Sequence, residues 1–439
     1  MKRVAKAVKA ERVARAEPRS IAVVGAGVAG CALVAQLRRL GCRAPITLLE
    51  TGRGSGGRAS TRRSRRDADL AVDHGAPLFN ISAAPPPALL APLLQGGWIE
   101  SWPSGPARRA QLQADGQVRA NAQIHAGQGD PRLEGALYRG SRGMETLTEG
   151  LLALAAAATP ASVSAPQVRY GVMVRQLLAS PGGPWRLLDA QGQLLAQADW
   201  LVLAGTLLAH PRAMRVFGWS EVPLAAAARQ LGDPELDGAL AAIAALESEA
   251  RSNLLLVIAA AAAQPWLSLP FRQLSFSPEA QRRWGLERLS IQPLAAGRVV
   301  VVAHSSAALA ARYLAVHGSR SSAGRLLAAP ADPAAETRLI NALSEALIDA
   351  LAGLLPQENP LAAVEQRQLM RWGAAFPCGS GLDAESMVCA ASRVALCGDA
   401  IAGSGFARIE GALRSGEWLA ERLQQQWPDP GALPVEFRP

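Results

Sequence analysis

Residues 20–50 constrain the fold of this chain more than any other stretch. Residues 21–24 form a short, β-branched apolar run of the kind that makes a fully buried parallel strand. Gly25, Gly27 and Gly30 follow in the spacing G-x-G-x-x-G. The first glycine permits a tight turn, the second lets a pyrophosphate approach the backbone, and the third lets a helix pack against the strand.

The residues after the glycine loop complete this unit. Residues 31–39 are good helix formers, so the N–H groups and the dipole of the predicted helix would face an anion. Residues 46–49 predict a second strand, and Glu50 follows where a carboxylate can accept ribose hydroxyls. This register predicts a site for an adenine dinucleotide; the alternative is a purely structural βαβ unit.

A second glycine-rich turn comes directly after Glu50 and leads into a basic segment. Gly57 and Arg58 lie in it, and backbone amides together with a guanidinium are suited to holding a diphosphate. The alternative is a solvated basic loop. We expect a ligand role for Arg58.

A further nucleotide-binding element is predicted near the other end of the chain. A buried strand ends at Gly398 and Asp399, and Glu410 and Gly411 then open a helix that runs to about residue 425. A carboxylate suits a polyol chain, and a helix N-terminus suits a group that becomes negative. A reduced flavin has both groups, a ribityl chain of hydroxyls and a ring that carries negative charge.

Length and charge set broad limits. The 439 residues leave room for two domains and a large core. The formal net charge is +9, and seven of the cations lie in the first 20 residues. The basic balance is therefore mostly local, and we expect no nucleic-acid partner, although a positive field would suit a phosphorylated substrate.

Cysteine usage and hydropathy indicate the compartment. The five cysteines are an odd number without metal-ligand spacing, which predicts buried thiols in a reducing, cytoplasmic compartment and no metal site. Apolar stretches such as residues 254–263 are about half of the ~20 residues that a spanning helix needs, so no transmembrane segment is expected. Residues 1–19 are predicted to be a solvated basic tail or an upstream start; a basic helix that docks on a membrane or polyanion is the alternative.

The pattern of elements predicts an α/β protein with an inserted α+β domain. Helices are expected over residues 141–157, 222–248 and 334–354, the last with apolar positions 339, 343, 347 and 351 on one face. Strands are expected over 168–178 and 185–195, as an antiparallel pair, and over 199–205, 254–258, 287–292 and 298–304. Residues 318–335 are expected to form a loop. The predicted division is a basic arm (1–19), a discontinuous nucleotide-binding domain (20–82, 140–210 and 366–426), a substrate domain (83–139 and 211–365) and a C-terminal tail (427–439).

Together these segments resemble the flavoproteins with two dinucleotide-binding elements that are related to flavin amine oxidases, and among them the renalase-like branch. Further matching pieces are Asp73-His74-Gly75-Ala76, Arg142-Gly143-Met144, Arg371-Trp372, Phe376-Pro377 and Arg408-Ile409-Glu410-Gly411-Ala412. The resemblance implies a Rossmann-like domain of the p-hydroxybenzoate hydroxylase type with an inserted substrate domain. The matching pieces span residues 21–425.

The resemblance also implies non-covalent FAD. Gly25, Gly27, Gly30, Gly57 and Arg58 would bind its diphosphate, Glu50 the ribose, Val174 the adenine, Gly398 and Asp399 the ribityl chain, and Glu410 and Gly411 the isoalloxazine. For renalase-like enzymes it implies hydride transfer from 2- or 6-dihydro isomers of NAD(P)H to flavin N5. Electrons then pass to O2, giving NAD(P)+ and hydrogen peroxide.

The positions of the lysines distinguish this chain from the flavin amine oxidases that place a lysine beside the flavin. The only lysines are Lys2, Lys6 and Lys9, so no lysine of the predicted domains could lie beside the flavin or form a Schiff base. Hydride loss from a dihydropyridine gives an aromatic cation and leaves no proton to remove. Such a reaction needs orientation more than a base, and we expect no catalytic acid or base.

Four residues are candidates for the substrate pocket. Arg371 could hold a phosphate or an amide and Trp372 could stack on a ring, although core packing for Trp372 and a surface position for Arg371 are the alternative. His304 and His74 are weaker candidates. Two other functions stay open: an amine or polyene (carotenoid-type) oxidoreductase with a different hydride donor or acceptor, and a non-catalytic nucleotide-binding or membrane-associated protein that uses the basic arm.

Overall fold

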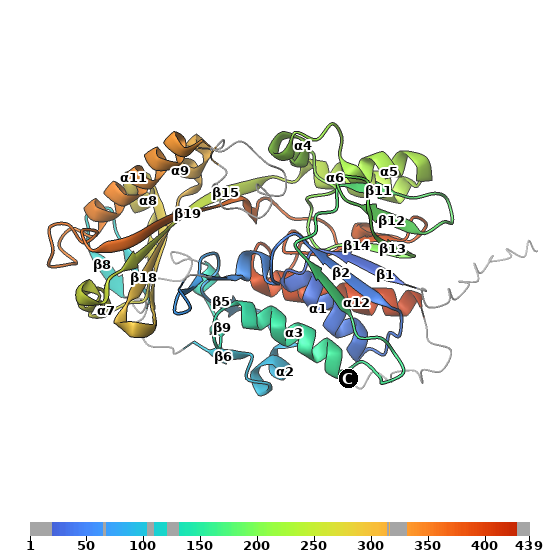
Figure 1. Cartoon of the computed structure of the whole chain (residues 1–439), viewed down its shortest axis with the longest axis horizontal. Helices are drawn as coiled ribbons and strands as arrows, with labels where there is room; N and C mark the ends of the chain where they lie inside the picture. The colour runs from blue at the N-terminus through green and yellow to red at the C-terminus, as the bar shows by residue number, and fades with distance from the viewer. Residues whose placement is uncertain are drawn as a thin grey trace, which may run out of the picture.

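The computed structural model describes residues 20–64, 67–102, 109–120, 131–313, 316 and 332–427. The predicted basic arm, residues 318–331 of the expected loop and residues 428–439 of the predicted C-terminal tail lie outside these ranges. The described chain forms two lobes, each built on a sheet (Figure 1). No helix within the described part combines the length and apolar character needed to cross a bilayer.

A six-stranded sheet forms the centre of the first lobe. Its order is β10-β2-β1-β14-β21-β20, and all neighbours pair in parallel except β20 with β21. These strands are short and mostly buried, as expected for a sheet covered on both faces. Their bounds are β10 (Gln167–Tyr170), β2 (Ile46–Glu50), β1 (Ile21–Val24), β14 (Trp200–Leu203), β21 (Val394–Leu396) and β20 (Val388–Cys389).

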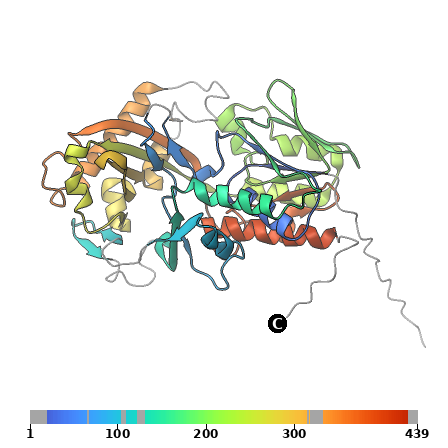
Figure 2. The same ribbon diagram turned by 60° about the horizontal axis from the view of Figure 1, so that its bottom comes forward.

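Three helices cover one face of this sheet. They are α1 (Val28–Arg39), α3 (Glu145–Ala157) and α12 (Ile409–Gln426). Helix α1 packs against both others, and Figure 2 brings this layer forward, with α3 in green and α12 in red. The approach of α12 to α1 depends on a small residue, because a Cβ on Gly416 would lie 2.6 Å from the carbonyl oxygen of Ala29.

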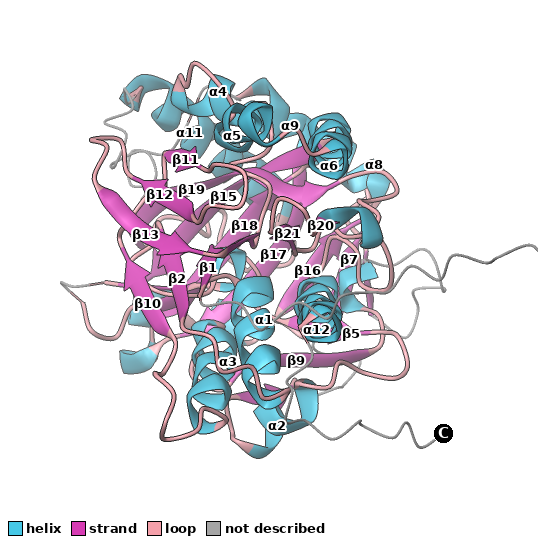
Figure 3. Ribbon diagram, turned by 90° about the vertical axis from the view of Figure 1, so that its right-hand side faces the viewer, coloured by secondary structure: helices cyan, strands magenta, loops and turns pink. Residues whose placement is uncertain are grey.

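The opposite face carries a small sheet and more helices. Figure 3 shows the sheet between the two layers. Leu224 and Ile243, in helices α5 and α6, belong to the same apolar cluster as Trp185 and Leu201. The elements are β11 (Gln176–Leu178), β12 (Trp185–Leu188), β13 (Leu194–Ala198), α4 (Arg212–Phe217), α5 (Pro223–Leu231) and α6 (Pro234–Ala245).

The second lobe is a seven-stranded sheet in the order β19-β15-β18-β17-β16-β7-β8. Only β16 and β7 pair in parallel. Helix α11 (Pro333–Ala350) packs on it through Leu339, Leu343 and Leu347, the face predicted from the periodicity. Its other elements are β7 (Arg109–Leu112), β8 (Val118–Ala120), β15 (Ser248–Ile258), α7 (Gln264–Leu267), β16 (Gln273–Phe276), α8 (Pro278–Trp284), β17 (Leu286–Pro293), β18 (Val299–Ser305), α9 (Ala307–Arg312) and β19 (Val364–Pro377).

Smaller elements join the two lobes. The pair β3 with β4 carries Thr61 opposite Asp73, and a three-stranded sheet in the order β5-β9-β6 lies near helix α2. Their bounds are β3 (Thr61–Arg63), β4 (Ala71–Asp73), β5 (Phe79–Ile81), α2 (Leu90–Gln95), β6 (Ile99–Ser101) and β9 (Ala136–Gly140).

Three details differ from the sequence expectations. Residues 167–170 pair in parallel with β2, so residues 168–178 are not one strand of an antiparallel pair. Helices α5 and α6 pack against the first lobe, because their apolar faces meet the β11–β13 sheet, and not within residues 211–365 as one unit. Strand β19 lies beside β15 in the second lobe, although residues 366–377 were expected in the nucleotide-binding domain.

Candidate active site

The first glycine loop has the geometry that its spacing predicts. Gly25 has φ 109°, a left-handed conformation that favours glycine, and its N–H donates to the carbonyl of Leu49. A Cβ on Gly30 would lie 2.1 Å from the carbonyl oxygen of Gly25, whereas a Cβ on Gly27 would meet nothing within 4 Å. Helix α1 therefore starts at a backbone with open space beside it, and no side chain caps it.

Glu50 lies at the end of β2, where the loop holds its carboxylate in place. The N–H of Ala26 donates to Oε2 at 2.9 Å, and the N–H of Gly52 donates to Oε1 at 2.5 Å. Each oxygen keeps a second lone pair for a hydroxyl. The position fits the predicted ribose contact.

The second glycine loop lies against the first. The N–H of Gly56 donates to the carbonyl of Ala26, and Gly57 has φ 57°. The guanidinium of Arg58 binds Asp399 with both Nη atoms, at 2.7 and 2.6 Å, and Nη1 also donates to the carbonyl of Ala375. Burial lowers and the Asp399 charge raises the pKa of Arg58, and the net direction is upward. The ion pair therefore connects the first glycine region to the C-terminal strand.

The C-terminal element also takes its predicted form. The N–H of Gly398 donates to Ser415 Oγ on helix α12. The carboxylate of Glu410 is fully buried and accepts the N–H groups of Ser82 and Ala83, both at 3.1 Å. Burial raises and these N–H groups lower the pKa of Glu410, and the net direction is downward. Its side chain therefore anchors a neighbouring loop.

A large cavity of about 1380 Å³ opens between the two lobes. Glu50 and Gly57 line one part of it, and His74, Arg371 and Trp372 line another. The first two residues belong to the dinucleotide unit and the last two to strand β19 of the second lobe. The cavity therefore brings predicted cofactor residues and predicted substrate residues together.

His74 and Trp372 form a stacked pair in the wall of this cavity. Their ring centroids are 5.5 Å apart, with 24° between the planes. Neither His74 Nδ1 nor Trp372 Nε1 has a hydrogen-bond partner among the described residues. Burial, and then the charge of Arg62, lower the pKa of His74 to about 4, so this ring is neutral near pH 7. Both ring nitrogens are thus buried without a partner among the described residues.

Two candidates lie apart from this pair. His304 is buried on β18 and is not part of the cavity lining; burial, followed by the charge of Arg288, lowers its pKa well below the usual value. Val174 is buried in the apolar cluster that covers the first sheet, between β10 and β11.

Arg212 is a residue of the cavity that the motifs did not reveal. It lies at the start of α4 and its guanidinium donates to the hydroxyls of Thr206 and Ser248. Burial, and next the charge of Arg58, lower its pKa to about 10. Only the loop after β14 places it here, and no spacing rule marks that loop.

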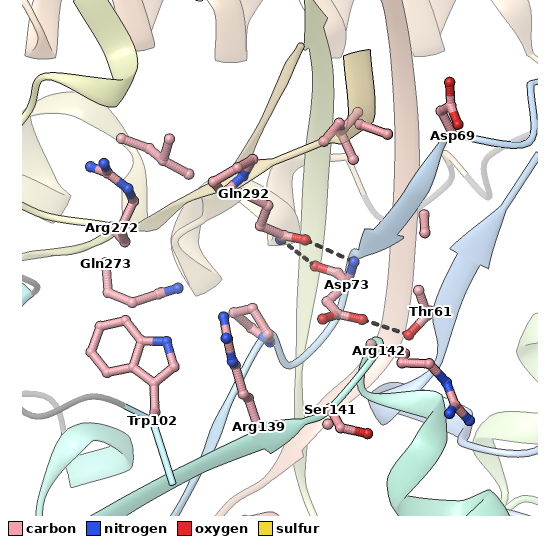
Figure 4. A pocket seen from close by; sticks show the side chains of 18 residues that line it. Thr61, Asp69, Asp73, Trp102, Arg139, Ser141, Arg142, Arg272, Gln273 and Gln292 are labelled. Carbon is pink, nitrogen blue, oxygen red and sulfur yellow. Dashed lines mark hydrogen bonds between the residues drawn. The ribbon is translucent and has the colours of Figure 1, made fainter. Parts of the chain in front are cut away.

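A smaller cavity of about 360 Å³ lies behind the segment that carries His74. Figure 4 shows Asp73 held there between Thr61 and Gln292. Thr61 Oγ1 donates to the Asp73 carboxylate at 2.6 Å, and the Gln292 side chain bonds both the N–H and the carbonyl of Asp73. Thr61 lines both cavities, so the Asp73 segment is the wall between them.

Comparisons with known proteins agree with this architecture. The family model of the NAD(P)-binding Rossmann-like domain matches residues 23–89. Comparison with curated proteins gives no match. The chain is similar in structure to an oxidoreductase from Methanosarcina mazei (TM-score 0.59, 12% identity, covering 92% of this chain and 100% of that one). It is also similar to cyclohexylamine oxidase from Brevibacterium oxydans IH-35A (0.58, 13%, 93% and 99%) and to putrescine oxidase bound to putrescine (0.56, 12%, 93% and 99%).

These likenesses define the fold. The chain has a Rossmann-like dinucleotide-binding unit in the two-lobed α/β architecture of these oxidases, over nearly its whole length. The predicted fold class is confirmed.

Proposed function

We propose that this chain is an FAD-dependent oxidoreductase of the amine oxidase type that acts, like renalase, on 2- or 6-dihydro isomers of NAD(P)H. The balanced reaction is dihydronicotinamide isomer + O2 + H+ → NAD(P)+ + H2O2. The observation that carries the proposal is the cavity lined both by Glu50 and Gly57 and by Arg371 and Trp372.

The residues present suit an extended dinucleotide. The open backbone at Gly27 and the uncapped start of α1 leave room for a diphosphate, and the oriented Glu50 carboxylate can accept ribose hydroxyls. Asp399, which accepts from Arg58, would bind the ribityl chain. When bound, FAD supplies the hydride acceptor at N5 and the route for electrons to O2.

The chain's own residues would orient the nicotinamide nucleotide. The indole of Trp372 offers a face for a planar ring, and Arg371 offers a guanidinium for a phosphate or amide. His74 is neutral, buried and stacked on Trp372, so it would support the indole and is not suited to proton transfer at pH 7. Positioning without a base is what hydride loss from a dihydropyridine requires.

The charge of the cavity favours an anionic substrate over an amine. A cationic amine is held best by carboxylates or by several aromatic faces. Among the described residues that line the cavity, arginines outnumber glutamates and none is a tyrosine. The charged lining residues are Arg53, Arg62, Arg63, Arg212, Arg215 and Arg371 with Glu50, Glu145, Glu247 and Glu249.

An amine or polyene oxidase is the second candidate. Its support is the apolar part of the wall, where Val216, Phe217, Leu246 and Met370 join a run of alanines. An apolar wall of this kind suits a hydrocarbon chain. Such an enzyme would use a different hydride donor.

Peroxide production by the FAD-loaded chain distinguishes the dihydronicotinamide oxidase from the amine oxidase. We expect peroxide from 2- or 6-dihydro-NAD(P) and none from putrescine or cyclohexylamine. Arg371→Gln should raise KM for the isomer roughly tenfold with a smaller change in kcat, because binding is weakened more than chemistry. Arg367→Gln, an exposed arginine four residues away on β19, is the matched control. Turnover of an amine but of neither isomer would contradict the proposal.

A further inference from the structure

Arg58, the arginine expected at the diphosphate, already makes three side-chain hydrogen bonds within the protein. Its Nη1 donates to Ala375 and Asp399, and its Nη2 donates to Asp399. A bidentate arginine–carboxylate pair satisfies both charges and fixes the geometry of the fork. Arg58 therefore acts first as a clamp between the glycine region and Asp399. Because Asp399 already balances the charge of Arg58, a second cation would strengthen the binding of an anion at the glycine loop.

Arg212 has the opposite environment. Its side-chain partners are two neutral hydroxyls, Thr206 Oγ1 at 3.2 Å and Ser248 Oγ at 3.5 Å. No carboxylate among the described residues forms an ion pair with it. Its guanidinium lines the large cavity and is partly withdrawn from water. A partly buried cation without a counter-charge is unfavourable unless a ligand supplies one.

Arg212 and the two charged groups that shift its pKa together carry a net positive charge. Arg58 and Asp399 act electrostatically on Arg212, the first lowering and the second raising its pKa. Since Arg58 and Asp399 neutralise each other, the three groups together carry one net positive charge. Glu50 and Gly57 share the same cavity, so this charge faces the space beside the dinucleotide unit.

We propose that Arg212 is the cation that binds the diphosphate of a dinucleotide in this cavity. The inference rests on the proposed function for the identity of that dinucleotide as FAD, but its chemistry requires only an adenosine diphosphate group. Arg212 is a binding residue here and takes no part in hydride transfer. Arg58 then holds Asp399 against the glycine region, and Arg212 supplies the positive charge that binds the diphosphate.

Binding titrations of the full chain test this. The ligands are FAD, ADP and riboflavin, and the variants are Arg212→Gln and Arg215→Gln. Arg215 lies three residues further along α4, lines the same cavity and is exposed, so its loss removes an equal charge without the proposed contact. We expect Arg212→Gln to weaken FAD and ADP binding about 10- to 100-fold, as a lost charge-assisted hydrogen bond does, and to leave riboflavin unchanged. Arg215→Gln should change each affinity by less than about twofold.

The outcomes of these titrations distinguish the inference from other roles of Arg212 and from the proposed function. Equal losses in both variants would show a general charge effect and overturn the inference. Unchanged FAD and ADP affinity in Arg212→Gln, with a shifted flavin reduction potential, would overturn it too, because Arg212 would then face the isoalloxazine. If the chain binds ADP through Arg212 but binds no FAD, the inference stands and the proposed function fails. A wild-type chain that binds neither ligand overturns both.

Discussion

Two glycines of one loop differ in what their missing side chains make possible. Gly30 lies so close to the carbonyl of Gly25 that a Cβ has no room, whereas Gly27 faces open space. We therefore expect Gly30 to be needed for folding and Gly27 for the approach of a ligand. This distinction is invisible in the motif, which shows only the spacing.

Alanine substitutions should separate the two tasks. Gly30→Ala should destabilise the chain by about 2–4 kcal/mol, because a 2.1 Å contact forces α1 away from β1. Gly27→Ala should keep the free energy of unfolding within about 1 kcal/mol and weaken FAD binding at least about tenfold, since a methyl group would occupy the diphosphate space. Urea unfolding and flavin titration measure the two effects. Equal stability losses would contradict this division.

The buried neutral histidine makes stability depend on pH. The pKa of His74 is about 4 in the folded chain, against 6.5 for an ordinary histidine, so the unfolded chain binds the extra proton between these values. The contribution of His74 is fully present above pH 6.5 and is lost as pH falls toward 4. Between pH 7 and 4.5 it amounts to roughly 2.5 kcal/mol.

A variant isolates this contribution from other titrating groups. His304 contributes in the same direction, whereas the raised pKa of Asp73 acts oppositely. We therefore compare wild type with His74→Gln by urea unfolding at pH 7 and 4.5. The wild-type chain should lose more stability on acidification than the variant does. Parallel pH profiles would show that His74 is accessible to protons in the folded chain.

At the scale of elements, the carboxylate of Glu410 joins the start of helix α12 to the loop at residues 82–83. Glu410 accepts the N–H groups of Ser82 and Ala83 and forms ion pairs with Arg408 and Arg414 at 3.4 and 3.2 Å. The helix start therefore holds the loop that enters the joining region. The negative charge of Glu410 is therefore used within the protein, in hydrogen bonds and ion pairs.

Removal of that carboxylate should be costly. Glu410→Ala removes the acceptor of two N–H groups and the ion-pair partner of two arginines, so we expect a loss of about 3 kcal/mol in the free energy of unfolding. Glu410→Gln keeps an acceptor and should lose clearly less. Chemical unfolding monitored by tryptophan fluorescence checks both. A change below about 1 kcal/mol in Glu410→Ala would refute the anchoring role.

Elements that are specified by residues close together in the sequence were predicted correctly, and pairings between distant segments were not. Strand β1, helix α1 and Glu50 lie within 30 residues, and periodicity with glycine spacing predicts them. The buried face of α11 was predicted in the same way. Pairing between distant segments was not: β10 joins β2 across more than 100 residues, and no local pattern specifies that register. Arg212 was missed because only the fold brings it near Asp399.

At the scale of the whole molecule, the cavity exists because two sheets meet. Strands β15 and β19 of the second lobe run side by side over most of their length and carry Arg371 and Trp372 to the first lobe. The first lobe contributes the dinucleotide unit, and the Asp73 segment joins the two (Figure 4). Neither lobe alone could present a cofactor to a substrate.

Anaerobic rapid mixing of the FAD-loaded chain with 2- and 6-dihydro-NAD(P) tests the central proposal most directly. Flavin absorbance is followed, with ordinary 4-dihydro-NADH beside the isomers. We predict fast bleaching by an isomer, slow or absent bleaching by NADH, and return of the yellow colour when air is admitted. A flavin spectrum that neither isomer bleaches would contradict the substrate, and a chain that cannot be loaded with FAD would contradict the cofactor itself.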